Sequence, residues 1–369
     1  MKVRAAVSRE AGRHPAIETL EIEEPRADEV LVRIVATGIC HTDLSINAAP
    51  APKPIVLGHE GAGVVERVGR AVTRVKPGDP VVIGPNFCGR CPTCRRNATS
   101  YCYESMTRNF GALRPDGSSP LSADGSLVYG RFFGQSSFST YSLADERAVI
   151  PAPADLSLEV LGPLGCGVHT GAGAVVNSLK VGPGQSIAVF GTGSVGLSAI
   201  MAARLVGASR IVAVDLIPAR LQLARELGAT DAIDGSPGTA ADAIRELTTY
   251  GVDFSLNTTH SPAVYTQAVA CLAHEGVAGF VTTPAGEWRP DLGQLLSGGR
   301  RLQGIIGGSA TPSLFIPMLI DYFRQGRFPF DRLITFYPFE HIDQALTDVE
   351  AGHTIKAVLR VGDQGGGLR

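Results

Sequence analysis

Residues 186–215, SIAVFGTGSVGLSAIMAARLVGASRIVAVD, decide the fold of the second half of the chain. They predict a strand, a glycine turn, a helix and a second strand that ends on an acid. Gly191, Gly193 and Gly196 form G-x-G-x-x-G after the apolar run SIAVF. The first glycine permits the tight turn, the second lets the backbone approach a pyrophosphate, and the third lets the helix pack on the strand. The helix N-terminus would offer N–H groups to the phosphates.

An acidic residue at the end of the second strand makes the glycine motif a more specific indication of a dinucleotide site. Asp215 follows Gly196 by nineteen residues and ends RIVAVD. A carboxylate there accepts hydrogen bonds from the adenosine ribose and repels a 2′-phosphate, which selects NAD over NADP. Leu216 next to it is not basic, which further disfavours NADP, and Arg220 is a candidate neighbour of the ribose. The alternative is a surface aspartate and a solvated arginine.

The rest of the chain predicts two domains of different texture. The runs VDFSLNTT and GVAGFVTT continue the alternation of strand and helix, which predicts a parallel, doubly wound sheet. Residues 1 to about 150 instead alternate short β-rich runs with Gly and Pro, which predicts a small, irregular β-barrel-type domain. We expect residues 110–133 to form a long loop. A length of 369 residues also exceeds one ordinary core.

Composition excludes several partners. A formal net charge of −2 gives no reason to expect binding to nucleic acid or to an anionic membrane. The N-terminus MKVRAAVSRE lacks the apolar region of a secretory signal, and no apolar run reaches the roughly 20 residues of a membrane span. We therefore expect a cytoplasmic protein with reduced, metal-bound thiols; a disulfide knot is the alternative.

Four of the seven cysteines predict a closed metal site. Cys88, Cys91, Cys94 and Cys102 read C-x2-C-x2-C-x7-C within residues 88–102. Four thiolates at such spacing form the complete tetrahedral shell of a structural zinc ion.

A second, open zinc site is predicted from residues outside this segment. Cys40, His59 and Cys166 supply one histidine and two cysteines and leave a fourth position free, as in catalytic zinc sites. As a Lewis acid, zinc would lower the pKa of an alcohol hydroxyl and prepare hydride transfer. Ligands on both sides of a domain boundary would place the metal close to a nicotinamide. The alternative is two buried thiols and a core histidine.

Thr42 and Asp43, which follow Cys40 closely, suit roles in support of the zinc ligands and the substrate. Asp43 could orient the second ring nitrogen of His59, because zinc-bound histidines usually donate that N–H to a carboxylate or carbonyl. Thr42 could take the proton of a substrate hydroxyl into a relay. Cys271 has no predicted role.

These motifs resemble those of the zinc-containing alcohol dehydrogenases of the medium-chain dehydrogenase/reductase superfamily. The resemblance covers nearly the whole chain. It implies an α/β protein with a GroES-like, β-rich catalytic domain at residues 1–167 and 306–369, and a Rossmann NAD-binding domain at residues 168–305. The matching segments are the four-cysteine lobe, LGCG around Cys166, GTGSVGL, and GHEGAGVVERVG with Gly58, His59, Glu60, Gly63 and Gly69.

The resemblance also implies further site residues. Glu60 would lie behind the catalytic zinc as an occasional ligand, and His41 would approach the cofactor pyrophosphate. Thr170 and Val195 would pack behind the nicotinamide, and Lys356 would reach a phosphate.

The chain departs from the family pattern at two positions. Where many members continue the proton relay to a histidine, this chain has Ser45, and where liver-type enzymes carry an aromatic pocket wall it has Gly84, which we expect to widen the pocket. Together with FFGQSSFSTY, these features resemble the aryl-alcohol (benzyl alcohol) branch most.

The expected function is NAD- and zinc-dependent oxidoreduction of primary alcohols and aldehydes, aromatic or allylic ones above all, with two zinc ions per subunit. One alternative is a formaldehyde dehydrogenase for S-hydroxymethyl thiol adducts, whose anion pocket would draw on Arg108, Arg114 and Arg131. Another is a non-enzymatic NAD-binding protein with one structural zinc ion. An apolar edge strand in the nucleotide domain predicts a homodimer or homotetramer.

Overall fold

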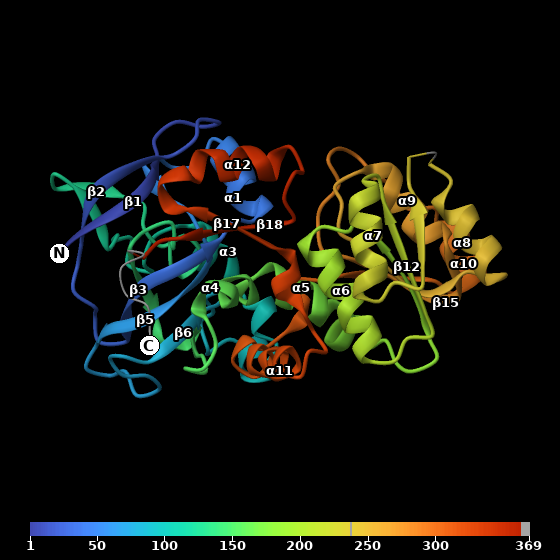
Figure 1. Ribbon diagram of the computed structural model, residues 1–369, viewed down its shortest axis with the longest axis horizontal. Helices are drawn as coiled ribbons and strands as arrows, with labels where there is room; N and C mark the ends of the chain where they lie inside the picture. Colours follow the sequence, from blue (N-terminus) through green and yellow to red (C-terminus); the bar gives the residue numbers. More distant parts are fainter. Residues whose placement is uncertain (237, 363–369) are drawn as a thin grey trace. The chain divides into compact units, whose positions relative to one another are not determined.

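A computed structural model describes residues 1–236 and 238–362, and its chain divides into two compact units (Figure 1). Unit 1 contains Met1–Cys166, Thr311–Pro317 and the chain from Asp331 on, and unit 2 contains Gly167–Ala310 and Met318–Phe330. The predicted boundary at 306 differs from this division. Residues 307–309 belong to unit 2 because they pack on its first helix: a Cβ on Gly173 would lie 2.5 Å from the Gly308 oxygen. The predicted catalytic domain beyond residue 362 lies outside the described residues.

Unit 1 is built on two sheets around one apolar core. The first has the order β4-β1-β2-β7-β8, and the second the order β10-β6-β5-β3-β18-β17 with β9 also paired to β3. Both faces of β3 are largely buried, and Val30, Leu31 and Val32 are fully buried. The strands are β1 (Lys2–Ser8), β2 (Ala16–Ile22), β3 (Glu29–Gly38), β4 (Ile55–Val56), β5 (Glu60–Val68), β6 (Pro80–Ile83), β7 (Leu121–Ala123), β8 (Ser126–Val128), β9 (Tyr141–Asp145), β10 (Val149–Pro151), β17 (Ile334–Pro338) and β18 (Lys356–Arg360).

The helices of unit 1 are short. Most of them connect strands, and α12 packs its apolar face on the core of the unit through Ile342, Leu346 and Val349. The helices are α1 (His41–Ala48), α2 (Pro92–Arg95), α3 (Ser105–Phe110), α4 (Leu158–Leu161) and α12 (Ile342–Glu350), with 3₁₀ turns η1 (Thr99–Tyr101), η2 (Phe132–Gly134), η3 (Glu146–Ala148), η4 (Gly162–Gly165), η7 (Phe330–Leu333) and η8 (Phe339–His341).

The segment 110–133 is not the single long loop that we expected. Strands β7 and β8 pair antiparallel within it, with Ala123 opposite Ser126. The two residues between them, Asp124 and Gly125, both have positive φ, at 47° and 77°. This is the backbone that a two-residue hairpin turn requires and that Asp-Gly adopts readily.

Unit 2 contains the predicted doubly wound sheet. Its six parallel strands have the order β13-β12-β11-β14-β15-β16, and Figure 1 shows α6 and α7 on one side of the sheet and α8 and α9 on the other. The chain order reverses between β11 and β14, the point where such sheets bind nucleotides. The strands are β11 (Ser186–Phe190), β12 (Arg210–Asp215), β13 (Asp231–Asp234), β14 (Val252–Asn257), β15 (Leu272–Phe280) and β16 (Arg301–Gly304).

Among the helices of unit 2, α6 follows from an apolar run, whereas α7 carries two arginines and a glutamate and buries only Ala224 and Leu227. Helix α6 buries the residues from Gly196 to Ala203, which explains its nearly uncharged sequence. The helices are α5 (Gly167–Gly173), continued as a π-helical turn η5 (Ala174–Leu179), α6 (Ser194–Leu205), α7 (Pro218–Leu227), α8 (Ala240–Thr248), α9 (Pro262–Ala270), α10 (Leu292–Gly298), the 3₁₀ turn η6 (Gly307–Ser309) and α11 (Pro312–Arg324), whose residues divide between the units. Within the described ranges, no helix has the length and apolar character that crossing a membrane requires.

Candidate metal centres and dinucleotide site

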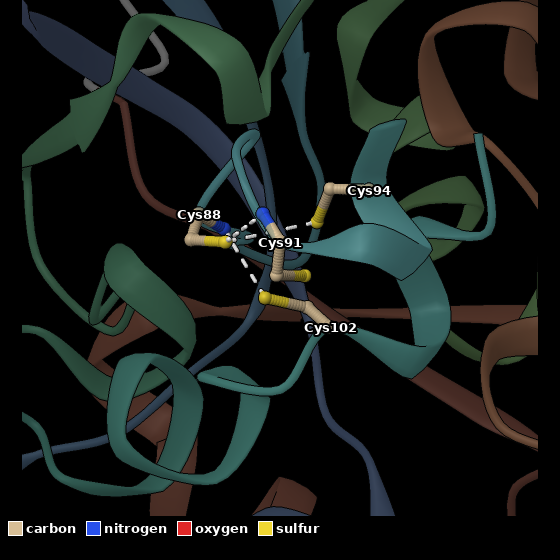
Figure 2. Close-up of side chains that lie close together, drawn as sticks. All are labelled: Cys88, Cys91, Cys94 and Cys102. Carbon is tan, nitrogen blue, oxygen red and sulfur yellow. Dashed lines mark hydrogen bonds between the residues drawn. The ribbon is translucent and has the colours of Figure 1, made fainter. Parts of the chain in front are cut away.

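The four cysteines of residues 88–102 converge on one point (Figure 2). Their sulfur atoms lie within 4.8 Å of one another, with Cys91 at the N-cap of α2 and Cys94 within that helix. All four are free thiols, and the 3.9 Å between the sulfurs of Cys88 and Cys94 is far longer than a disulfide bond. Backbone N–H groups of Arg90 and Cys91 point at the Cys88 sulfur. The arrangement fits a four-thiolate zinc shell and not a disulfide knot.

A second group of metal-ligand atoms belongs to Cys40, His59, Glu60 and Cys166. One ligand atom from each lies within 4.8 Å of the others. His59 and Glu60 are fully buried, and Nε2 of His59 has no hydrogen-bond partner. Because a buried ring nitrogen without a partner is costly, this atom suits a metal ligand. All four residues lie in unit 1, so the expectation that ligands come from both sides of a domain boundary was wrong.

Asp43 organises this group as the sequence predicted. Its Oδ1 is 3.0 Å from Nδ1 of His59 and accepts a bond from the N–H of Gly58, also at 3.0 Å. Its Oδ2 accepts the N–H of Cys40 at 2.9 Å. One buried carboxylate therefore fixes two of the ligand residues and directs Nε2 of His59 toward the cysteines.

Lys356 does not lie where a phosphate could be reached. Its buried Nζ donates to both carboxylate oxygens of Glu60 at 2.8 Å and to the Ile39 oxygen at 2.9 Å. These three bonds use all its donors. Strand pairing explains the position, because Gly38 of β3 is opposite both Glu60 of β5 and Val358 of β18. A Cβ on Gly38 would lie 2.0 Å from Glu60.

In the Glu60–Lys356 pair, burial and the charge of the partner shift each pKa in opposite directions. Burial raises the pKa of Glu60 to about 7, and the Lys356 charge opposes that rise. Burial lowers the pKa of Lys356, but the charge and hydrogen bonds of Glu60, together with the charges of Cys40 and Cys166, raise it above its usual value. The pair holds the Glu60 carboxylate beside the other three ligand residues.

Helix α1 carries the predicted relay residues. The hydroxyl of Thr42 is 3.7 Å from the sulfur of Cys40 and is half-buried. Ser45 lies one turn further along and is exposed, as is His41 at the start of the helix. Gly84 lies against Ile150 and Pro312, which a Cβ there would meet at 3.1 and 3.4 Å, and its effect on the width of a pocket stays a prediction.

Sequence reasoning missed an aromatic cluster on the zinc-ligand candidate His59. The ring of Phe133 stacks on its imidazole at 4.3 Å, and Phe132 meets it edge-on at 5.5 Å. Phe110 packs edge-on against both phenylalanines. Phe133 has φ of 49°, a rare conformation for a bulky side chain. The double phenylalanine of FFGQSSFSTY was the available signal.

The glycine turn of unit 2 has the predicted geometry. Gly191 has φ of 85°, and a Cβ on Gly196 would lie 1.9 Å from the Gly191 oxygen. A Cβ on Gly193 would meet nothing within 4 Å, so the backbone is open there to a phosphate. The turn therefore fits a dinucleotide, for which NAD would supply the pyrophosphate.

The other predicted cofactor residues occupy elements around this turn. Asp215 ends β12 beside Gly191, whose N–H bonds to the Val214 oxygen at 2.8 Å. Thr170 and Val195 lie on α5 and α6, two helices that touch at Gly171, where a Cβ would be 2.0 Å from the Val195 oxygen. Arg220 is half-buried in the first turn of α7.

Comparisons with known proteins agree with this arrangement. Residues 26–154 match the alcohol dehydrogenase GroES-like domain, and residues 194–321 match the zinc-binding dehydrogenases. The chain is 48% identical over 368 residues to a geraniol dehydrogenase of Castellaniella defragrans. The similarity covers 97% of this chain and 98% of the relative.

Two solved structures are similar over 98% of this chain and 100% of their own. One is an alcohol dehydrogenase zinc-binding domain protein from Burkholderia ambifaria, 49% identical with a TM-score of 0.96. The other is the benzyl alcohol dehydrogenase of Acinetobacter calcoaceticus, 42% identical with a TM-score of 0.95. The chain therefore belongs to the zinc-containing alcohol dehydrogenases of the medium-chain dehydrogenase/reductase superfamily, NAD-dependent enzymes with two zinc ions per subunit.

Proposed function

We propose that this enzyme oxidises primary alcohols that carry an aromatic ring or an allylic double bond, and reduces the corresponding aldehydes. The observation that carries the proposal is the ring of Phe133, stacked on His59 within the cluster of Phe110 and Phe132. Flat π faces beside the metal ligands would favour planar, unsaturated substrates over saturated chains. The names of two relatives, a geraniol dehydrogenase and a benzyl alcohol dehydrogenase, support the same substrate class.

The residues of the ligand group and those around it would have different roles in the reaction. Zinc bound by Cys40, His59 and Cys166 would supply a Lewis acid for the alcohol oxygen, and NAD would accept the hydride. Asp43 holds the His59 ring in the tautomer that leaves Nε2 free for the metal. We assign to the Thr42 hydroxyl the transfer of the substrate proton, because it lies beside the Cys40 sulfur.

The thiol-adduct alternative receives no support from the arginines that it would need. Arg114 is buried and paired with Glu29 at 2.7 Å, and Arg131 is buried and paired with Asp145 at 2.9 Å. Arg108 bonds to Glu104, also at 2.9 Å, and only 10% of its side chain is exposed. Since each already has a carboxylate partner, none is an open anion site. The non-enzymatic alternative leaves the second ligand group without a purpose.

A substrate screen tests the proposal. NAD reduction should be measured with benzyl alcohol, cinnamyl alcohol and geraniol against ethanol and hexanol. We expect kcat/KM to be about tenfold or more higher for the unsaturated alcohols, the scale of discrimination that apolar pocket contacts give. Phe133→Leu should narrow this ratio. Equal rates for hexanol and cinnamyl alcohol would contradict the substrate class, and stimulation of formaldehyde oxidation by a cellular thiol would favour the alternative.

We further propose that the protein is a homodimer or homotetramer in which β16 pairs with β16 of a second copy. This strand is an outer edge of the sheet, and Leu302 on it is 37% exposed. Leu296 on α10 and Ile306 after β16 are 83% and 58% exposed. The opposite edge, β13, carries two aspartates instead. Open edges pair readily with another strand, and identical edges can do so about a two-fold axis.

Light scattering tests this interface. The unaltered protein should have at least twice the monomer mass, and Leu302→Glu should lower that mass. Leu247→Glu, at a similarly exposed leucine on α8, is the matched control and should not. A monomeric unaltered protein would contradict the proposal. We also propose a cytoplasmic location, supported by seven free thiols, which cell fractionation can test.

A further inference from the structure

We propose that Thr192, between the first two glycines of the turn, is a positioning residue that fixes the Asp215 carboxylate for NAD. The inference rests on NAD as the cofactor. Thr192 is fully buried, and both its N–H and its hydroxyl donate to Oδ2 of Asp215, at 2.6 and 2.7 Å. Among the described residues of the glycine turn, Thr192 is the one whose side chain forms a hydrogen bond with this carboxylate.

The second oxygen of Asp215 is held from the opposite side. Its Oδ1 accepts the N–H groups of Leu216 at 2.8 Å and Ile217 at 3.0 Å, which closes the turn after β12. The carboxylate is therefore fixed between the turn after β11 and the turn after β12. Strand register makes this possible, because Phe190 is opposite Val214 and the N–H of Gly191 bonds to the Val214 oxygen at 2.8 Å, which brings the glycine turn beside Asp215.

Fixing the carboxylate matters for the choice of cofactor. Asp215 distinguishes NAD from NADP only while its charge points at the ribose 2′ position. A side chain held by four hydrogen bonds is already ordered when the cofactor arrives, so less conformational freedom is lost on binding. Without the Thr192 hydroxyl, Oδ2 keeps one donor of two, and the side chain can rotate away from the ribose.

The same turn offers a matched control on its other side. The Thr258 hydroxyl donates to the oxygens of Phe190 and Gly191, both at 3.0 Å. A Cβ on Gly191 would lie 2.6 Å from this hydroxyl. Thr258 therefore supports the glycine turn through the backbone of β11 and not through Asp215. Removing its hydroxyl should affect the phosphate site shared by NAD and NADP, but not the discrimination between them.

The test is the dissociation constant of each cofactor, measured by calorimetry on the zinc-loaded protein without alcohol. Thr192→Val should weaken NAD binding by about fivefold or more, since a hydrogen bond to a charged group is lost. NADP binding should weaken less, so the NADP-to-NAD ratio of dissociation constants falls. Thr192→Ser keeps the hydroxyl and should stay within about twofold of the unaltered protein. Thr258→Val should change both constants by the same factor.

Several outcomes would overturn this role. Unchanged NAD binding in Thr192→Val would do so, and tighter binding would show that the hydroxyl competes with the ribose instead. If Thr258→Val changed the NADP-to-NAD ratio of dissociation constants as much as Thr192→Val, the effect would come from a general loosening of the glycine turn. If Thr192→Val does not fold, Thr192→Ala carries the same expectation. Failure of the unaltered protein to bind NAD would refute the cofactor itself, whereas failure of the alcohol screen would leave these binding measurements valid.

Discussion

At the level of single residues, α1 carries two hydroxyls shortly after the Cys40 ligand. Thr42 is half-buried with its oxygen 3.7 Å from the Cys40 sulfur, and Ser45 is exposed three residues later. Residues three apart share a helix face, so a proton could pass from one to the other and then to water. A serine hydroxyl does not act as a base near neutral pH, so Ser45 can only bridge.

We therefore expect opposite results from the two hydroxyls. Thr42→Val keeps the shape but removes the proton acceptor, so kcat for alcohol oxidation should fall by about 100-fold or more, while Thr42→Ser retains activity. Ser45→Ala should change kcat by less than about tenfold. Steady-state kinetics with zinc analysis of each variant checks this. A loss of several hundredfold in Ser45→Ala, with both zinc ions retained, would make Ser45 an essential relay member.

The same site shows how far residue-level prediction reaches. Cys40, Asp43 and His59 could be predicted from residue types within short segments, because ligand chemistry limits which side chains can serve. Lys356 could not, because its partner Glu60 is 296 residues away and strand pairing alone brings them together. The double phenylalanine signals an aromatic cluster, but the stacking of Phe133 on His59 was hidden, because it depends on the positive φ of Phe133 that no residue preference indicates.

At the level of elements, a buried ionic network joins β3, β9 and the segment before η2. Glu29 on β3 bonds to Arg114 at 2.7 Å and lies 3.3 Å from Arg131, which also bonds to Asp145 on β9. Asn86, two residues before the first zinc-lobe cysteine, donates to the same aspartate. Burial raises the pKa of Glu29, but the bonds from Arg114 and the charge of Arg131 lower it below its usual value.

This network predicts a pH-dependent contribution to stability. Because the folded pKa of Glu29 is lowered, its stabilisation is complete above the usual carboxyl pKa of about 4.3 and is lost as pH falls below it. Glu29→Gln leaves two buried arginines short of a charge and should lower the free energy of unfolding by about 3 kcal/mol at pH 7, with a smaller effect at pH 3.5.

Urea denaturation at the two pH values measures both effects. Glu24→Gln is the matched control, because Glu24 forms an exposed pair with Arg67 and its loss should cost less than about 1 kcal/mol. Equal losses for Glu24→Gln and Glu29→Gln at pH 7 would show that the buried network contributes nothing beyond a surface pair.

Elements were predictable where a pattern was long. The sheet of unit 2 followed from apolar runs such as residues 187–190, which are buried on both faces as parallel strands require. Strands β7 and β8 have three residues each, too few for an alternation to be recognised, and composition suggested a loop. Their Asp124–Gly125 turn was the stronger signal and should have taken precedence.

At the scale of the whole molecule, each unit holds its own ligand residues. Both groups of candidate zinc ligands lie in unit 1, and the glycine turn with Asp215 lies in unit 2. The family resemblance implied a first boundary after residue 167, and the first segment of unit 1 ends at Cys166. The sequence could not predict that 318–330 return to unit 2, because α11 is continuous across the division and only long-range packing assigns its halves.

Because zinc would bind in unit 1 and NAD in unit 2, we expect each ligand to stabilise mainly the unit that binds it. Chelation of zinc should raise amide hydrogen exchange in residues 88–102 and α3 of unit 1, because structural zinc contributes folding energy directly. The β11 amides of unit 2 should keep their protection. NAD at about 100 times its dissociation constant should instead stabilise unit 2 by about 2.7 kcal/mol and slow exchange there. Exchange mass spectrometry resolves both segments, and Cys91→Ser should reproduce the chelation result without a chelator. If exchange rose equally in β11, the two units would unfold as one, and zinc would stabilise the nucleotide domain as much as the domain that binds it.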